Sequence, residues 1–153
     1  LVYLIPVRLL HAQHPTAAFL DEYPRIRAAY APLISACKRG NVRAFDAALQ
    51  DPTLERSLVR LGVYLAMERA RDVCITRLVR RVWRQQGGGT RVRLAPVGTA
   101  LQWLNCASDA HGAEWLVATQ IARGRIKGYI AHERQMMVLS ATEPFPHAAL
   151  TML

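Results

Sequence analysis

Four arginines at helical spacing are the side chains in this sequence whose chemistry is easiest to interpret. They recur at intervals of three and four residues: Arg77, Arg80, Arg81 and Arg84. A helix would bring all four to one face, and guanidinium groups bind phosphate or carboxylate oxygens bidentately. Apolar side chains at the same spacing would occupy the opposite face and pack inward: Ile75, Leu78, Val79 and Val82. The pattern predicts a helix that presents these arginines, here called the arginine stripe, to nucleic acid, to an acidic protein or to solvent.

Other basic residues extend the predicted surface. Residues 90–94 alternate as a short strand does, which would expose Arg91 and Arg93, and Lys127 and Arg134 border a predicted wing. The predicted nucleic-acid-binding set is therefore Arg77, Arg80, Arg81, Arg84, Arg91, Arg93, Lys127 and Arg134. Residues 1–68 carry a net charge of +2 and residues 69–153 one of +7. This asymmetry favours a polyanionic partner for the second half, and RNA or duplex DNA would be bound through phosphates with weak sequence preference.

No cluster of residues in the sequence favours catalysis. The five histidines lack metal-ligand spacing, and Gly87-Gly88-Gly89 lacks the lysine of a nucleotide-binding loop. Cys37, Cys74 and Cys106 lie far apart in odd number, which is typical of reduced core residues rather than of disulfides or a zinc site. We therefore expect an intracellular protein in a reducing compartment, with no enzymatic activity, no cofactor, no metal and no membrane partner.

A second predicted helix, at about residues 110–123, carries a different kind of surface. Its outer flank shows Trp115, Ala118, Thr119, Ala122 and Arg123, which form the predicted partner-binding set. A helix that reads bases in the major groove needs polar and basic side chains there, and this flank has one basic residue. The flank suits a packed protein contact. Trp115 would be an interface anchor or, as the more common alternative for tryptophan, a local core residue.

The first 86 residues carry the signals of short helices joined by brief turns. Pro24 and Pro32 would each begin a helix, and Gly40-Asn41 would end one helix and cap the next. Residues 54–86 read as one long helix or two nearly continuous ones. Such helix pairs are typical of a helical-repeat bundle of the TPR or HEAT kind, whose units stack to bury their faces. The abrupt start at Leu1 predicts that earlier repeats are missing.

The remaining residues predict a second, mixed part of the fold. After a flexible joint at the three glycines, residues 87–142 run strand, helix, helix, strand, wing, strand, which is the order of a winged helix. Its helices are expected at about residues 97–106 and 110–123, and its last two strands at 125–131 and 135–140. Residues 143–153 would form a tail. The fold class is therefore mainly α, with a helical-repeat part joined to a C-terminal winged helix.

Three segments resemble the PCI-domain family, in the branch of the signalosome-associated subunit twelve and the PCI subunit of the mRNA-export complex TREX-two. They are Tyr3-Leu4-Ile5-Pro6 with Leu9-Leu10; Lys38-Arg39-Gly40-Asn41 with Phe45-Asp46 and Ala48-Leu49; and Lys127-Gly128-Tyr129-Ile130-Ala131-His132-Glu133 with Val138-Leu139-Ser140 and Pro144-Phe145-Pro146. Glu68-Arg69, Arg71-Asp72 and Thr90-Arg91-Val92 look like fungal members. Two positions depart from the branch: Gln120, where an apolar residue is usual, and Gly112 in a first helical turn.

The resemblance implies a scaffold subunit rather than an enzyme. Members of this branch pair with another PCI-domain protein through their winged helices and hold a small acidic protein of the Sem/Dss type along their helical repeats. Together these subunits bind nucleic acid in the nucleus, in transcription-coupled mRNA export and splicing. The alternative from the residues alone is a purely structural subunit whose arginines hold an acidic protein.

Overall fold

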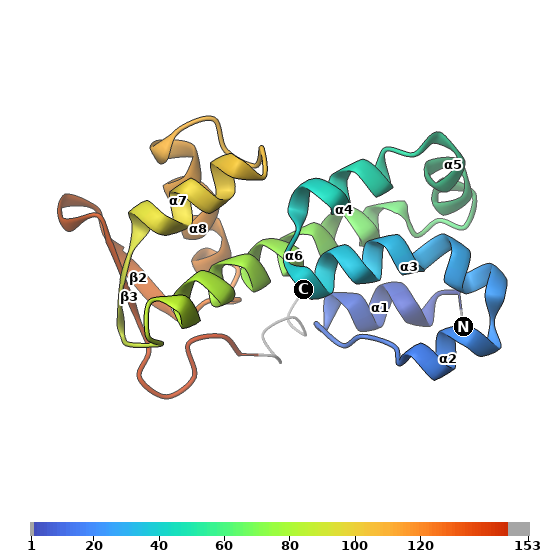
Figure 1. The fold of residues 1–153 in the computed structure, drawn as a ribbon, viewed down its shortest axis with the longest axis horizontal. Coiled ribbons are helices and arrows are strands. Elements are labelled where there is room, and N and C mark those ends of the chain that lie inside the picture. Colours follow the sequence, from blue (N-terminus) through green and yellow to red (C-terminus); the bar gives the residue numbers. More distant parts are fainter. Residues whose placement is uncertain (1, 147–153) are drawn as a thin grey trace. The chain divides into compact units, whose positions relative to one another are not determined.

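The computed structural model describes residues 2–146 and is mainly helical (Figure 1). It divides into two compact units within one long helix, α6 (Tyr64–Gln85), between Ile75 and Thr76. The sequence analysis placed the domain boundary between residues 86 and 87, at the start of the glycine run. In the structure the glycine run lies within the second unit. Of the predicted tail, residues 147–153 lie outside the described residues.

Local capping chemistry sets the helices of the first unit. They are α1 (Leu4–Leu10), α2 (Ala17–Glu22), α3 (Pro24–Arg39), α4 (Val42–Leu49), α5 (Pro52–Arg60) and the first half of α6. Gly40 ends α3 in the left-handed conformation, with φ of 66°, and the Asn41 side chain then accepts the Ala44 N–H. Asp51 caps α5 in the same way. These stops and starts confirm the sequence signals, and residues 54–86 prove to contain two helices.

The core of the first unit comes from the inward faces of α3, α4 and α6. Tyr30 and Leu33 of α3 and Phe45 of α4 are almost completely buried, and α3 packs against both α2 and α4. Burial of such large side chains contributes roughly 1.5–3 kcal/mol each to stability. An ion pair accompanies this packing. Arg71 on α6 donates from Nε and from a terminal nitrogen to the two carboxylate oxygens of Asp46, at 2.7 and 2.9 Å.

Pro32 does not begin a new helix, which corrects the sequence prediction. It lies inside α3, which runs without interruption from Pro24 to Arg39. A proline removes the hydrogen bond to the carbonyl four residues earlier, here that of Ala28. Both Ala28 and Pro32 are solvent-exposed, so water can solvate that carbonyl, while the buried side chains of the opposite face hold the helix together. Tertiary packing therefore overrides the local signal.

The second unit has the element order of a winged helix. After α6 come β1 (Arg91–Arg93), α7 (Leu94–Trp103), α8 (Ala110–Ala122), β2 (Gly128–Ala131), a 3-10 turn (His132–Arg134) and β3 (Met136–Leu139). The three strands pair antiparallel in the order β1-β3-β2, with α7 packed against α8. This order and the turn at residues 132–134 confirm the predicted wing.

The first helix of this unit begins earlier than the sequence indicated. It spans Leu94–Trp103 rather than residues 97–106, because the Leu94 N–H is already held by the Gln135 carbonyl and Pro96 sits in the first turn. Asn105, with φ of 55°, then turns the chain away from the helix. The shift places Trp103 on the last turn of α7, where its indole is 80% exposed.

Two residues hold the sheet and α8 in position. A Cβ atom on Gly128 would collide with the Val138 carbonyl oxygen of the neighbouring strand, so β2 and β3 approach each other as closely as only glycine allows. Gln120 points inward from α8, is completely buried, and accepts a hydrogen bond from the Thr76 hydroxyl at 3.2 Å. The unusual glutamine of the sequence is thus accommodated by a polar partner.

Candidate nucleic-acid interface

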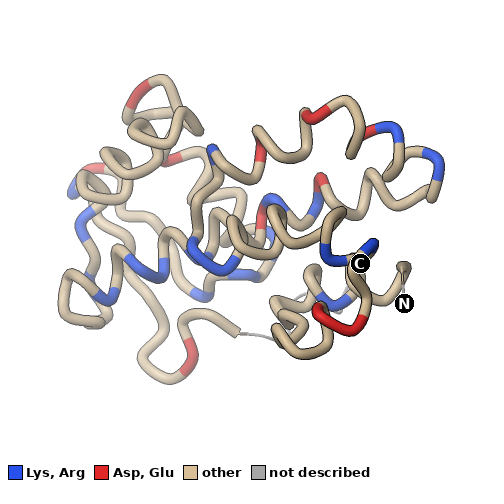
Figure 2. The backbone as a smooth tube through the Cα atoms, turned by 45° about the vertical axis from the view of Figure 1, so that its right-hand side comes forward, with Lys and Arg blue, Asp and Glu red and all other residues tan. Residues whose placement is uncertain are grey.

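The arginine stripe lies on the second half of α6, in the second unit. On the same stretch of helix Val79 and Val82 are buried, and Leu78 is half-buried, as the apolar spacing predicts. On the other side Arg81 and Arg84 are exposed, and Arg77 and Arg80 are half-buried. Figure 2 marks the lysine and arginine positions along the backbone. One rigid element therefore presents all four guanidinium groups.

Arg80 is the residue whose environment is least favourable to a positive charge. Burial lowers the pKa of its guanidinium below the ordinary value, and the neighbouring charges of Arg84 and Arg77 lower it further. Its Nε atom is buried and has no hydrogen-bond partner in the described part of the chain. Arginine remains protonated at neutral pH in spite of such a shift. The stripe is thus a concentration of positive charge that an anion would stabilise.

The two arginines of β1 are tied to the end of α6. Arg91 and Arg93 are exposed on either side of buried Val92. The Gln86 side chain accepts the Arg93 N–H at 3.0 Å and donates to the Arg93 carbonyl at 3.2 Å. The Trp83 indole N–H donates to the Gly89 carbonyl at 2.8 Å. The glycine segment is therefore a hydrogen-bonded turn rather than an unattached joint, and it places β1 directly after the stripe.

Lys127 and Arg134 lie at opposite ends of the sheet. Lys127 precedes β2, where its backbone carbonyl accepts the Ser140 N–H and its ammonium group pairs with Glu143 at 3.2 Å. Arg134 is exposed in the 3-10 turn. It lies two residues before Met136, which pairs with Arg93 across β1 and β3. The structure thus joins Arg93 to the end of the stripe helix through Gln86, and it places Lys127 and Arg134 at opposite ends of the β2–β3 pair.

The outer flank of α8 is an exposed and largely apolar surface. Trp115 is 67% exposed, so it is not a local core residue of this chain. Ala118, Ala122 and Arg123 are also exposed, and the half-exposed Thr119 hydroxyl donates to the Trp115 carbonyl at 2.9 Å. The buried side chains of α8 lie on the other face. The predicted partner-binding set therefore forms one helix face with little polar character.

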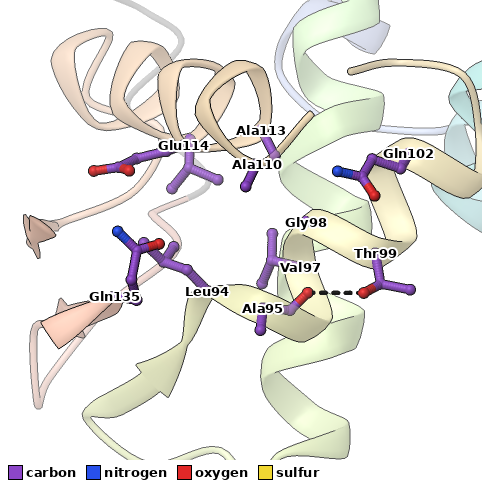
Figure 3. A pocket seen from close by; sticks show the side chains of 11 residues that line it. Leu94, Ala95, Val97, Gly98, Thr99, Gln102, Ala110, Ala113, Glu114 and Gln135 are labelled. Carbon is purple, nitrogen blue, oxygen red and sulfur yellow. Dashed lines mark hydrogen bonds between the residues drawn. The ribbon is translucent and has the colours of Figure 1, made fainter. Parts of the chain in front are cut away.

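A small cavity of about 310 Å³ lies between α7 and α8 (Figure 3). Its walls are mostly apolar, with Val97 and Gly98 from α7 and Val117 from α8, while Glu114 and Gln135 stand at its edge. The Glu114 carboxylate is paired with His132 Nδ1 at 2.7 Å. Within residues 2–146 no group of three or more His, Cys, Asp or Glu side chains could hold a metal.

Sequence reasoning missed one exposed aromatic residue next to the stripe. Trp103 lines a groove of about 460 Å³ between the end of α6 and α7. The helical pattern contained the signal, because Trp103 falls opposite the buried Val97 and Leu101 on α7. Sequence analysis placed this helix at residues 97–106 instead of Leu94–Trp103, and the exposed position of Trp103 on its last turn was therefore not recognised. In the described helices no segment is both long and apolar enough to cross a membrane.

Comparisons with known proteins found relatives along almost the whole chain. A protein of Mycosarcoma maydis named "Protein CSN12 homolog" is 40% identical over 157 residues, covering 95% of this chain and 35% of that protein. "COP9 signalosome complex subunit 12" of Eremothecium gossypii is 34% identical, covering 95% of this chain and 38% of that protein. "PCI domain-containing protein 2 homolog" of Caenorhabditis briggsae is 33% identical, covering 95% and 34%. The chain spans about a third of the length of these relatives. No family model matches it.

Proposed function

The chain belongs to the PCI-domain family, in the branch of the proteins named CSN12 and PCI domain-containing protein 2, and from this premise we propose that it serves as a non-enzymatic scaffold subunit. In this role it pairs with a second PCI-domain protein and with a small acidic protein of the Sem/Dss type. It contributes a basic platform that binds RNA or duplex DNA through phosphates. The setting is the nucleus, in transcription-coupled mRNA processing or export.

The observation that carries the proposal is the clustering of like charges around Arg80. A half-buried guanidinium whose charge is opposed by burial, Arg84 and Arg77 is a poor structural element by itself. Phosphate oxygens would supply both the counter-charge and acceptors for the guanidinium hydrogens. Arg91 and Arg93 would continue the contact onto β1. Phosphate contacts of this kind fix position on a nucleic acid without reading its bases.

Pairing with a second PCI-domain protein would use the outer flank of α8. An exposed tryptophan amid small side chains gives a flat surface on which a partner helix can pack closely, and tryptophan is common among residues that dominate interface energy. Arg123 stands at the end of this flank, where it would contact a partner's acidic rim. Because α8 and the arginine stripe are separate surfaces, one chain can bind both partners together.

The second candidate function is a purely structural subunit that makes no direct contact with nucleic acid. It is favoured by the same clustering, because a disordered acidic protein could neutralise the stripe as phosphates would. Its acidic side chains would need to follow the face of α6. Both functions include an acidic partner, so they differ in what the stripe binds: loss of its charges should weaken nucleic-acid binding under the first function and acidic-protein binding under the second.

The test is a binding titration of labelled RNA and DNA with the chain, alone and together with a Sem/Dss-type protein, across a salt series. We expect wild-type binding to weaken steeply with salt and to tolerate sequence changes. Reversal of three charges, Arg80→Glu, Arg81→Glu and Arg84→Glu, should weaken binding about 100-fold at low salt and reduce the salt slope by about 2 to 3.

A matched control reverses three exposed arginines of the first unit, Arg43, Arg56 and Arg60. This triple variant has the same net charge as the stripe variant, so general electrostatic attraction falls equally in both. A loss confined to the stripe variant supports the platform. If the stripe variant keeps the nucleic-acid affinity and the salt slope of the control, the stripe is not the platform; if it loses the acidic protein instead, the structural role of the arginines gains. If the wild-type chain binds no nucleic acid and only the acidic protein, the purely structural function replaces the platform.

A further inference from the structure

The groove beside the arginine stripe is the strongest unassigned feature of the second unit. It is open, has a volume of about 460 Å³, and lies between the last turns of α6 and the outer face of α7. Val82 and Gln85 form its wall on α6, and Pro96, Thr99 and Trp103 form its wall on α7. Among the large hydrophobic side chains of the described residues, Trp103 is the most exposed.

The Trp103 indole lines the groove and is largely exposed to solvent. The buried residues of α7 lie on the opposite side of the helix, so the indole makes no contribution to the core. The other two tryptophans differ from it. Trp83 packs against Phe145 with ring centroids 5.2 Å apart, and Trp115 stands on the flank of α8. Neither of them lines the groove between α6 and α7.

The groove and the arginine stripe are continuous around α6. At 100° per residue, Arg81 lies only about 40° from Gln85 around the helix axis, and Arg84 lies about 100° from Gln85, on the far side of Arg81. The wall of the groove therefore passes straight into the cationic face. An occupant of the groove would have its apolar, flat part against Trp103 and its negative part against Arg81 and Arg84.

We propose that this groove binds a nucleobase of a single-stranded nucleic acid, stacked on the Trp103 indole, while Arg81 and Arg84 hold the flanking phosphates. The inference rests on the proposed function and deepens it, because it names single strands as the class of nucleic acid. A base offers a flat π-face for stacking whatever its identity, and stacking with adjacent cationic contacts is how proteins hold single strands without sequence preference.

Binding a base in this groove costs more free energy for a duplex than for a single strand. The bases of a duplex are stacked on each other, and extruding one requires unpairing and unstacking. A duplex would therefore contact the arginines alone. The structure thus predicts a preference for single strands that depends on Trp103, added to a phosphate affinity that depends on the stripe.

The test compares a labelled 12-nucleotide single-stranded RNA with a duplex of the same sequence in a fluorescence-anisotropy titration. Trp103→Ala should weaken single-strand binding by about 10-fold and leave duplex binding and the salt slope unchanged. Trp103→Phe should recover part of the loss, because phenylalanine retains a smaller stacking surface. Trp115→Ala is the matched control, since it removes another exposed tryptophan away from the groove. Thermal unfolding of each variant checks that the fold is intact.

The possible outcomes separate the two proposals. If the stripe variant loses binding but Trp103→Ala binds single strands like wild type, the platform stands and the stacking site is wrong. An equal loss for single strand and duplex in Trp103→Ala also overturns the stacking site, because stacking acts on unpaired bases. If neither nucleic acid binds wild-type protein, with or without the Sem/Dss-type protein, both proposals fail and the groove is left to a protein partner.

Discussion

The two units of this chain differ in how one half-buried arginine of each, Arg71 and Arg80, is matched. In the first unit, ion pairs serve the fold: Arg71 is held by both oxygens of Asp46, and Arg27 pairs with Asp21. In the second unit, Arg80 is surrounded by like charges and its Nε atom has no hydrogen-bond partner. Residues 76–153 contain ten basic and four acidic side chains. Four of these basic residues share one face of α6, where the repulsion around Arg80 costs stability, and binding of a polyanion would offset that cost.

The largest effect should come from a substitution that lowers the stability of the second unit and leaves that of the first unchanged. Gly128→Ala places a Cβ against the Val138 carbonyl, so β2 must move away from β3, and we expect the second unit to lose about 3 kcal/mol. Hydrogen exchange should then accelerate in β2 and β3 while α3 and α4 stay protected. Gly89→Ala is the control, because a Cβ there meets no atom within 4 Å. Uniform loss of protection would contradict the independence of the units.

A smaller loss should follow from breaking the ion pair of the first unit. Asp46→Ala removes two charge-assisted hydrogen bonds from Arg71 at a site where both side chains are only about a third exposed, and should cost about 2 kcal/mol in the free energy of unfolding. Asp21→Ala removes the more exposed pair with Arg27 and should cost less than about 0.5 kcal/mol. Denaturant titration measures both. Equal costs would mean that burial does not govern the strength of these pairs.

A pH titration tests the first unit through Tyr30. Burial raises the pKa of its phenol, with a smaller contribution from Tyr3, so the unfolded chain ionises before the folded one. Stability is therefore fully present below pH ~10 and falls as the pH rises above that value. Tyr30→Phe should flatten this fall and cost about 1 kcal/mol at neutral pH, because the hydroxyl donates to the Val2 carbonyl. An unchanged alkaline slope in the variant would assign the fall to other groups.

The smallest effect should have the opposite sign and lie in the arginine stripe. Arg80→Gln keeps the helix propensity, removes a desolvated charge and relieves repulsion with Arg84 and Arg77, so stability should stay equal or rise by about 0.4 kcal/mol. The gain should shrink in high salt. Arg43→Gln on α4, an exposed position, serves as the control in the same unfolding titration. A loss above about 1 kcal/mol would show that Arg80 supports the fold.

The parts of the fold that depend on neighbouring residues were predictable from the sequence. Gly40, Asn41, Asp51 and Asp109 act within one turn of their own position, and the structure places each at the helix end that its chemistry indicates. The order of the winged helix was predictable for the same reason. Pro32 was not, because its tolerance depends on a buried face of α3 that other helices supply.

The site divides in the same way between local and non-local information. The arginine stripe follows from spacing on one helix, and the structure leaves its four arginines together. The link from Gln86 to Arg93 could not be predicted, since an amide at a helix end has many possible partners. The groove at Trp103 depends on where α7 begins. The Gln135 carbonyl accepts the Leu94 N–H at that start, and Gln135 lies far from Leu94 in the sequence, so a local pattern could not reveal it.

The buried Gln120 has a consequence for how α8 finds one orientation. The helix is nearly as apolar on its outer flank, with Trp115, Ala118 and Ala122, as on its buried side with Ala113 and Val117. Hydrophobicity alone therefore discriminates weakly between rotational states of this helix. A state turned by one residue would leave the amide of Gln120 without the Thr76 hydroxyl and bury a different face. The buried hydrogen bond of Gln120 thus favours one rotational state of α8 about its axis, and in that state Trp115 faces outward.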